Sequence, residues 1–177
     1  NMLKVDDDTI LCHRGIYMYG QKRTGKSSIM AHLTKEIIEK YQNKYLIVEI
    51  GSLGDIPLDD KFENSFKLRL VLKLKRKLKK ERKEIYSILD KDGLFIDETI
   101  SFDEIIMTIC DSLDGEVILF LIDEFTYIYE GIEKKVIADT FPHFWKAFLQ
   151  NHNVCSIVIG MDSMKKFVSD KRYINDC

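Results

Sequence analysis

The segment 20–27, with the sequence GQKRTGKS, constrains the fold more than any other part of the chain. The apolar run 15–19 before it predicts a buried strand. The run 28–38 after it predicts a helix, because its apolar residues recur every three or four positions. The segment matches the pattern G-x-x-x-x-G-K-[ST], which between a strand and a helix indicates a phosphate-binding loop. The alternative is a chance match in a glycine-containing turn, and the flanking strand and helix argue against it.

The residue types of this loop suit a polyphosphate ligand. Gly20 and Gly25 allow a positive φ and let the backbone approach phosphate without an intervening Cβ. Backbone amides and the helix dipole favour an anion at the N-terminus of the following helix. Lys26 is expected to place its charge between the β- and γ-phosphates, and Ser27 to put its hydroxyl on Mg²⁺. The predicted nucleotide contacts of this segment also include Arg23, Thr24 and Ser28.

A second informative segment is 116–124, where an apolar run ends in two acidic residues. The run predicts a buried central strand, and its carboxyl end lies where ligands of open α/β sheets bind. There Asp123 is predicted to hold Mg²⁺, directly or through water, and Glu124 to orient and deprotonate an attacking water. The alternative is an acidic cap of the next helix, but the phosphate loop in the same chain favours the functional interpretation.

The remaining patterns predict an alternation of strands and helices. The runs 45–50 and 154–160 are apolar and predict buried strands. Residues 61–91 carry one apolar stripe and predict a helix too long for one face of a small sheet, which either projects or breaks near Lys79-Lys80. The sequence S-x-x-E at 101–104 predicts a capped helix through Ser112. The aromatic residues of the helical run 144–149 are expected in the core. Asp6-Asp7-Asp8 is interpreted as an exposed turn, residues 10–12 as a short strand and Asn43-Lys44 as a turn.

Residues 73–83 form a basic cluster on the predicted long helix. Such a cluster is able to contact a nucleic-acid backbone. It is equally typical of a solvated helix face, and Glu81 offsets part of its charge. Because no aromatic residue is interleaved for base stacking, a nucleic-acid partner is kept as an alternative and is not favoured.

Composition bounds the remaining possibilities. The chain has 177 residues, 45% of them hydrophobic, and a net charge of −2. These values suit a single domain over residues 1–177 and demand neither a nucleic acid nor an acidic membrane. Four scattered cysteines with no metal-binding spacing, and no apparent signal or membrane span, predict a cytoplasmic protein with reduced thiols. Asn1 before Met2 resembles a tag remnant, and we expect this domain to be a fragment of a longer multidomain protein.

Three motifs together resemble prokaryotic P-loop NTPases of the additional-strand, catalytic-glutamate group, which includes AAA+ and STAND-type ATPases. They are the loop 20–27, the strand and acids at 119–125 and the strand 157–160 followed by Met161-Asp162-Ser163. The resemblance covers about residues 14–170. It implies a three-layer αβα fold with a mainly parallel sheet in the order 45–50, 117–122, 156–159, 16–19. It also implies that the chain is truncated before a fifth strand, an arginine finger and a lid or winged-helix domain.

The resemblance further implies a function. ATP and Mg²⁺ would be the bound cofactors, and hydrolysis of the β–γ bond would drive a signalling or assembly switch. Lys26 and Glu124 would be catalytic, Ser27 and Asp123 would hold the metal, and Asp162 or Ser163 would sense the γ-phosphate. A neighbouring subunit in a homo-oligomer of the full-length protein would supply the arginine finger.

Three other functions remain open at this stage. A GTPase switch needs N-K-x-D after a strand, whereas Asn43-Lys44 precedes its strand and lacks the Asp. A small-molecule or nucleoside kinase also uses the loop, but the pair Asp123-Glu124 favours water over an acceptor hydroxyl. The third is a binding module with little turnover, in which nucleotide regulates assembly or nucleic-acid binding.

Overall fold

Alternating strands and helices build the computed structural model, which describes residues 15–41 and 44–165. In chain order the elements are β1 (Gly15–Tyr19), α1 (Lys26–Lys40), β2 (Tyr45–Ser52), α2 (Phe62–Glu81), α3 (Lys83–Lys91), α4 (Phe102–Ser112), β3 (Val117–Asp123), α5 (Thr126–Glu133), α6 (Phe141–Asn151) and β4 (Val154–Gly160). The predictions for residues 6–8, 10–12 and Asn43 lie outside the described residues.

The four strands form one sheet in the order β1-β4-β3-β2, and every neighbouring pair is parallel. The strand order predicted from the sequence is confirmed. Because the strands are parallel, their carboxyl ends meet at one edge of the sheet. Tyr19 pairs with Gly160 there, and Ser52 pairs with Asp123. The loop after β1 and the acidic residues after β3 therefore come to the same edge.

One strand boundary differs from the prediction in a way that matters for the site. The sequence places Gly51 and Ser52 in a loop, but β2 continues through them. The pairing with β3 shifts between Glu49 and Gly51, so Ile50 is an extra residue in a bulge. Gly51 has φ 85°, a left-handed conformation that glycine adopts at little cost. The bulge lets the strand bend and still pair, and it delivers Ser52 to the ligand edge.

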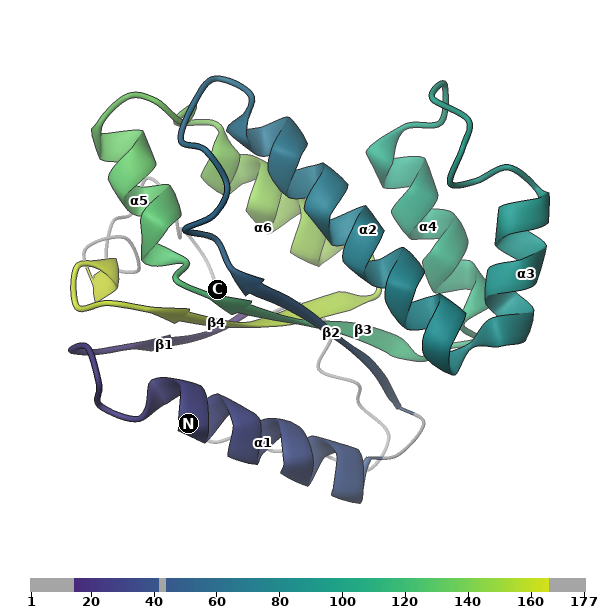
Figure 1. The fold of residues 1–177 in the computed structure, drawn as a ribbon, viewed down its shortest axis with the longest axis horizontal. Helices are drawn as coiled ribbons and strands as arrows, with labels where there is room; N and C mark the ends of the chain where they lie inside the picture. The colour runs from purple at the N-terminus through teal and green to yellow at the C-terminus, as the bar shows by residue number, and fades with distance from the viewer. Residues whose placement is uncertain (1–14, 42–43, 166–177) are drawn as a thin grey trace.

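Helices cover both faces of the sheet. Figure 1 shows α1 on one face and α2, α4, α5 and α6 on the other, with α3 beyond the end of α2. The arrangement is α/β and is compatible with a three-layer αβα fold. No helix among the described residues is long and apolar enough to cross a membrane.

The sheet separates a large core from a small one. β3 alternates between them: Ile118, Phe120 and Ile122 face the large core, whereas Val117, Leu119 and Leu121 face the small one. This explains why its sequence is apolar throughout. The stripe of α2 enters the large core, and its members Phe62, Phe66, Leu70, Leu74 and Leu78 are all buried as predicted.

The long helical run breaks at Arg82, slightly later than the predicted position. Arg82 has φ −133° and ψ 58°, which is not helical. Its guanidinium donates two hydrogen bonds to the carboxylate of the buried Glu116, and these bonds raise the pKa of Arg82. This tertiary contact favours a break at Arg82, and a local pattern does not reveal it.

Two helices that pack in the large core have the features that the sequence predicted for them. The Ser101 hydroxyl accepts a hydrogen bond from the Glu104 amide at 3.2 Å and caps α4, as predicted. In α6, Trp145 and Phe148 are buried, and the Trp145 ring meets Phe66 of α2 at a centroid distance of 5.6 Å. The aromatic residues of this helix are core residues, as expected.

Candidate nucleotide-binding site

The loop after β1 folds into a turn that opens directly into α1. Arg23 has φ 64° and Gly25 has φ 82°, and Gly25 is the N-cap residue of α1. A Cβ built on Gly25 would meet no atom within 4 Å. The glycine is therefore needed for its backbone conformation and for an open approach, and local crowding plays no part.

The N-terminus of α1 presents backbone donors at this opening. The first helical hydrogen bond runs from the Ile29 amide to the Gly25 carbonyl at 2.9 Å. The amides of Lys26, Ser27 and Ser28 come before it and have no acceptor within the helix. Three amides and the positive end of the helix dipole thus point toward an anion site.

Lys26 holds its ammonium group over the inside of the loop. Its Nζ donates to the carbonyl oxygen of Gly20 at 2.8 Å and to that of Gln21 at 2.5 Å. The Thr24 hydroxyl lies 3.4 Å from Nζ and itself donates to the Gln21 carbonyl at 2.9 Å. The positive charge is therefore kept at the mouth of the loop, next to the amides of α1.

Ser27 and Asp123 meet across the edge of the sheet. The Ser27 hydroxyl donates to Oδ2 of Asp123 at 3.2 Å, although the two residues are 96 positions apart in the sequence. One hydroxyl and one carboxylate are a suitable pair for Mg²⁺, which keeps several waters and takes the rest of its ligands from phosphate. Among residues 15–41 and 44–165, no group of three His, Cys, Asp or Glu side chains forms a metal site from protein alone. The donor set fits a metal that arrives with a polyphosphate.

Glu124 adopts a strained backbone conformation directly after β3. Its φ is 57°, which is uncommon for a residue with a side chain. The Glu124 amide donates to Oδ1 of Asp123 at 2.7 Å, and its carboxylate Oε2 accepts a hydrogen bond from the Ser52 hydroxyl. A Cβ on Gly54 would lie 2.7 Å from the same oxygen. The β2 end therefore holds this carboxylate in place.

One cavity of about 790 Å³, within the size range of small-molecule sites, is lined by Lys26, Ser27, Asp123 and Glu124 together with neighbouring residues. The lining residues come from the loop after β1, the start of α1, the loop after β2, the ends of β3 and β4 and the helix α5: Lys22, Arg23, Gly25, Lys26, Ser27, Ser28, Gly54, Asp123, Glu124, Thr126, Tyr127, Glu130, Ile159, Gly160 and Met161. The cavity therefore joins residues of the loop 20–27 to the acidic pair, as the strand order implies.

The predicted residues differ in how close they lie to this cavity. Gly20 and Thr24 do not line it, but both contact Lys26, which does. Asp162 is exposed and follows the lining residue Met161 without lining the cavity itself. The role of Asp162 or Ser163 as a γ-phosphate sensor stays a prediction.

Several residues of the site were missed by the sequence analysis. Thr126 is buried, and its hydroxyl accepts a hydrogen bond from the Met161 amide at 2.6 Å, which ties the start of α5 to the end of β4. A Cβ on Gly160 would collide with the Thr126 hydroxyl and with Met164. Ser52 had a usable signal, because it follows the strand predicted next to the Asp123 strand. No sequence signal marks Thr126 or Tyr127 as a site residue, since threonine and tyrosine are common in any helix.

The two cysteines among residues 15–41 and 44–165 lie away from this cavity. Cys110 and Cys155 are buried, and neither lines it. Burial raises the pKa of the Cys110 thiol to about 11, which disfavours the nucleophilic thiolate.

Comparisons with known proteins do not assign this site. A scan of protein-family models and a search of curated proteins both return no match to the chain. The site geometry and the resemblance of its motifs therefore carry the functional argument.

Proposed function

We propose that the chain binds ATP with Mg²⁺ and hydrolyses its β–γ bond, as the nucleotide-driven switch of a signalling or assembly ATPase. The observation that carries the proposal is the Ser27–Asp123 hydrogen bond. It joins the loop that holds the free helix amides and the Lys26 ammonium to the strand that ends in two acidic residues. A polyphosphate with a divalent cation is the ligand that uses all of these groups together.

Each side chain has a distinct role in this proposal. The α1 amides and Lys26 bind the phosphates, and Lys26 stabilises the negative charge that develops on the leaving oxygen. Ser27 and Asp123 would hold Mg²⁺, which supplies charge neutralisation when bound. Glu124 orients water and accepts its proton. An arginine from a neighbouring subunit is expected to complete the site, and such a residue is typically worth a factor of about 10³–10⁵ in rate.

A second candidate function is a nucleotide-binding module with little turnover, which would regulate assembly or nucleic-acid binding. The contact between Ser52 and the Glu124 carboxylate favours it, because a carboxylate held by a hydroxyl is less available to activate water. Both candidates predict nucleotide binding, and they differ in whether Glu124 matters for turnover.

Binding is tested by calorimetry and thermal unfolding with Mg²⁺ and ATP. At a ligand concentration of about one hundred times Kd, we expect a gain of about 2.7 kcal/mol in the free energy of unfolding. Lys26→Ala should abolish this gain, and Lys35→Ala should keep it, because Lys35 is exposed on the same helix and pairs with Glu39. An unchanged melting shift in Lys26→Ala would refute the loop assignment. Competition by GTP, measured in parallel, tests whether the site prefers adenine or guanine as the nucleobase.

Hydrolysis is tested with Glu124→Gln, which keeps the shape of the side chain and removes the base. We expect ATP binding to persist and phosphate release without an added acceptor to fall by a factor of about 10² or more. Glu130→Gln is the matched control, since Glu130 is another carboxylate lining the cavity. Equal turnover in Glu124→Gln and the parent would favour the low-turnover module.

A further inference from the structure

A second groove of about 410 Å³ lies between the end of β2 and the outer side of α2. Its floor is apolar, with Ile50 of β2 and Leu68 and Leu72 of α2. Leu68 is 58% exposed and Leu72 is 43% exposed, so two large apolar side chains of neighbouring turns face outward together. Single exposed leucines are ordinary, but a pair inside a groove favours a binding surface.

The groove follows the edge of the sheet. In the part of the chain that the structure describes, β2 is the last strand and pairs only with β3. Ile50, Gly51 and Ser52 are consecutive residues and all line the groove. The groove therefore runs along the outer side of β2, where the Ser52 carbonyl oxygen already accepts a hydrogen bond from the Arg69 guanidinium at 2.8 Å. An extended peptide is the ligand that pairs with the backbone of an edge strand.

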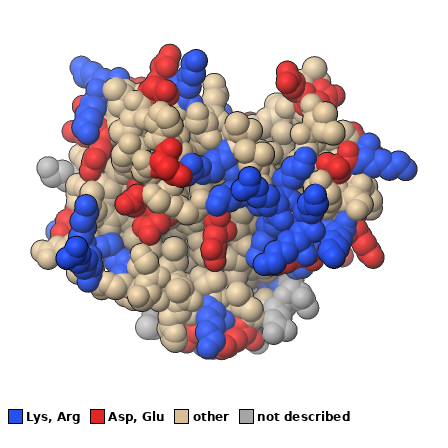
Figure 2. Space-filling model, viewed as in Figure 1, with Lys and Arg blue, Asp and Glu red and all other residues tan. Residues whose placement is uncertain are grey.

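The wall of the groove carries an excess of positive charge, with Arg69, Lys73 and Arg76 against the single carboxylate of Asp55. On α2, Lys67, Arg69, Lys75 and Lys77 each have a carboxylate within 4 Å. Lys73 and Arg76 line the groove and form no salt bridge with any described residue, although the charge of Lys73 helps to lower the pKa of Asp55. Figure 2 shows Lys and Arg side chains gathered over the part of the molecule where α2 and α3 lie. The excess of positive charge favours an acidic ligand.

From these three observations we propose that the groove is a docking site for an extended acidic segment of a partner protein. Acidic side chains of the segment pair with Lys73 and Arg76. Its apolar side chains pack on Leu68 and Leu72, and its backbone lies along the edge at Gly51. The φ of 85° at Gly51 and the open space around its Cβ position leave that backbone accessible.

A peptide explains the groove better than a nucleic acid does. Among its lining residues no aromatic side chain offers a stacking surface for bases. The carboxylate of Asp55 also lines the groove, and its hydrogen bond from Arg69 lowers the pKa of Asp55. Asp55 is therefore ionised at neutral pH and would repel a phosphate backbone. A peptide is able to place its acidic residues away from Asp55, whereas a nucleic acid carries a charge at every phosphate.

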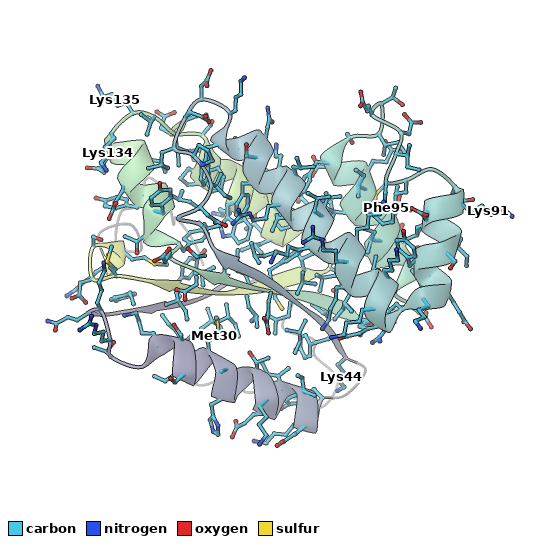
Figure 3. All side chains as sticks on the ribbon, in the orientation of Figure 1. Met30, Lys44, Lys91, Phe95, Lys134 and Lys135 are labelled. Carbon is cyan, nitrogen blue, oxygen red and sulfur yellow. The ribbon has the colours of Figure 1, made fainter. Side chains whose placement is uncertain are left out.

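The test is a selection of random peptides displayed on phage against the full chain, without nucleotide. Selected peptides are then labelled, and their affinity is measured by fluorescence anisotropy for the parent and for two double variants. Lys73→Glu with Arg76→Glu reverses the groove charge. Lys91→Glu with Lys134→Glu makes the same net change at exposed lysines that lie far apart and outside the groove (Figure 3). Thermal unfolding checks that each variant is folded, because surface substitutions typically change stability only slightly.

We expect enriched peptides that combine acidic with apolar residues, and an affinity that falls about tenfold or more in the groove variant but is unchanged in the control variant. Leu72→Ser should weaken the binding of the same peptides, although it leaves the charges of the groove unchanged. The proposal is wrong if no peptide is enriched, or if the groove variant binds the selected peptides as tightly as the parent does.

Two other outcomes would also overturn it. Loss of oligothymidylate binding in the groove variant, with no peptide enriched, would identify a nucleic-acid site. A parent dimer that becomes monomeric in the groove variant would identify a contact between two copies of this chain. Because no step uses nucleotide, these results are independent of the proposed ATPase activity.

Discussion

The helix that carries the candidate phosphate site, α1, is packed very differently from α2 on the opposite face of the sheet. In the described part of the chain α1 contributes no fully buried residue, whereas α2 contributes five. The small core reaches α1 only through the partly buried Met30, Leu33 and Ile37. Figure 3 shows Met30 between α1 and the sheet.

This difference shows where stability and ligand binding are placed. Each fully buried Leu or Phe side chain contributes about 1.5–3 kcal/mol, so the face with α2 supplies most of the hydrophobic stabilisation. Helix α1, which presents amides and Lys26 to a ligand, has fewer buried apolar side chains. Contacts with a ligand at the N-terminus of α1 would restrict the motion of this helix, as packing restricts the motion of α2. Segments of low local stability are common at binding sites for this reason.

The largest expected effect comes from the same substitution made on the two faces. Leu70→Ala removes a side chain that is 0% exposed in α2 and should cost about 2.7–5 kcal/mol in the free energy of unfolding. Leu33→Ala removes a partly buried side chain of α1 and should cost less than half as much. Urea unfolding monitored by circular dichroism measures both. Equal losses would show that the two faces are packed alike.

The next effect concerns dynamics and how ATP changes them. Without ligand, amides in the middle of α1 should exchange hydrogen faster than those of α2, because fewer buried contacts oppose local opening. With Mg²⁺ and ATP at about one hundred times Kd, protection in α1 should rise by up to about a hundredfold, with little change in α2 beyond the global gain. Hydrogen exchange read by mass spectrometry resolves both helices. A ligand that protects only α2 would contradict the proposed site.

The smallest effect tests two hydroxyls that hydrogen-bond to helix backbone, one at the N-cap of α4 and one within α1. Ser101→Ala removes the hydroxyl that caps α4 and should cost about 1 kcal/mol. Thr34→Ala in α1 removes a hydroxyl that donates to the Met30 carbonyl of its own helix, and the change should stay within about 0.5 kcal/mol. Thermal unfolding of the two variants under identical conditions gives the comparison. A Thr34→Ala loss equal to that of Ser101→Ala would show that α1 depends on its own side-chain bonds.

Much of the fold follows from local patterns. The apolar runs at 45–50 and 117–122 predicted strands, and the stripe from Phe62 to Leu78 predicted the buried face of α2. These predictions succeed because a fully buried strand must be apolar on both faces and a helix packs with a period of 3.6 residues. The strand order came from the resemblance of the motifs, since local patterns do not specify which strands are neighbours.

The candidate site was predictable only in part. The sequence named Lys26, Ser27 and Asp123 because their motifs are short and contiguous. It missed Ser52, because a bulge at Ile50 extends β2 beyond the apolar run. It also missed Thr126, whose bond to Met161 joins the ends of two strands that are separate in the sequence.

The sequence by itself therefore determined the elements and the chemical groups available: a glycine-rich loop before a helix, and an acidic pair after a buried strand. Only the tertiary structure decided which of these groups meet. Ser27 reaches Asp123 across 96 positions and Ser52 reaches Glu124 across 72. Such contacts depend on the order and register of strands, which arise from packing over the whole sheet, and a local pattern of residues carries no record of a partner so distant in the chain.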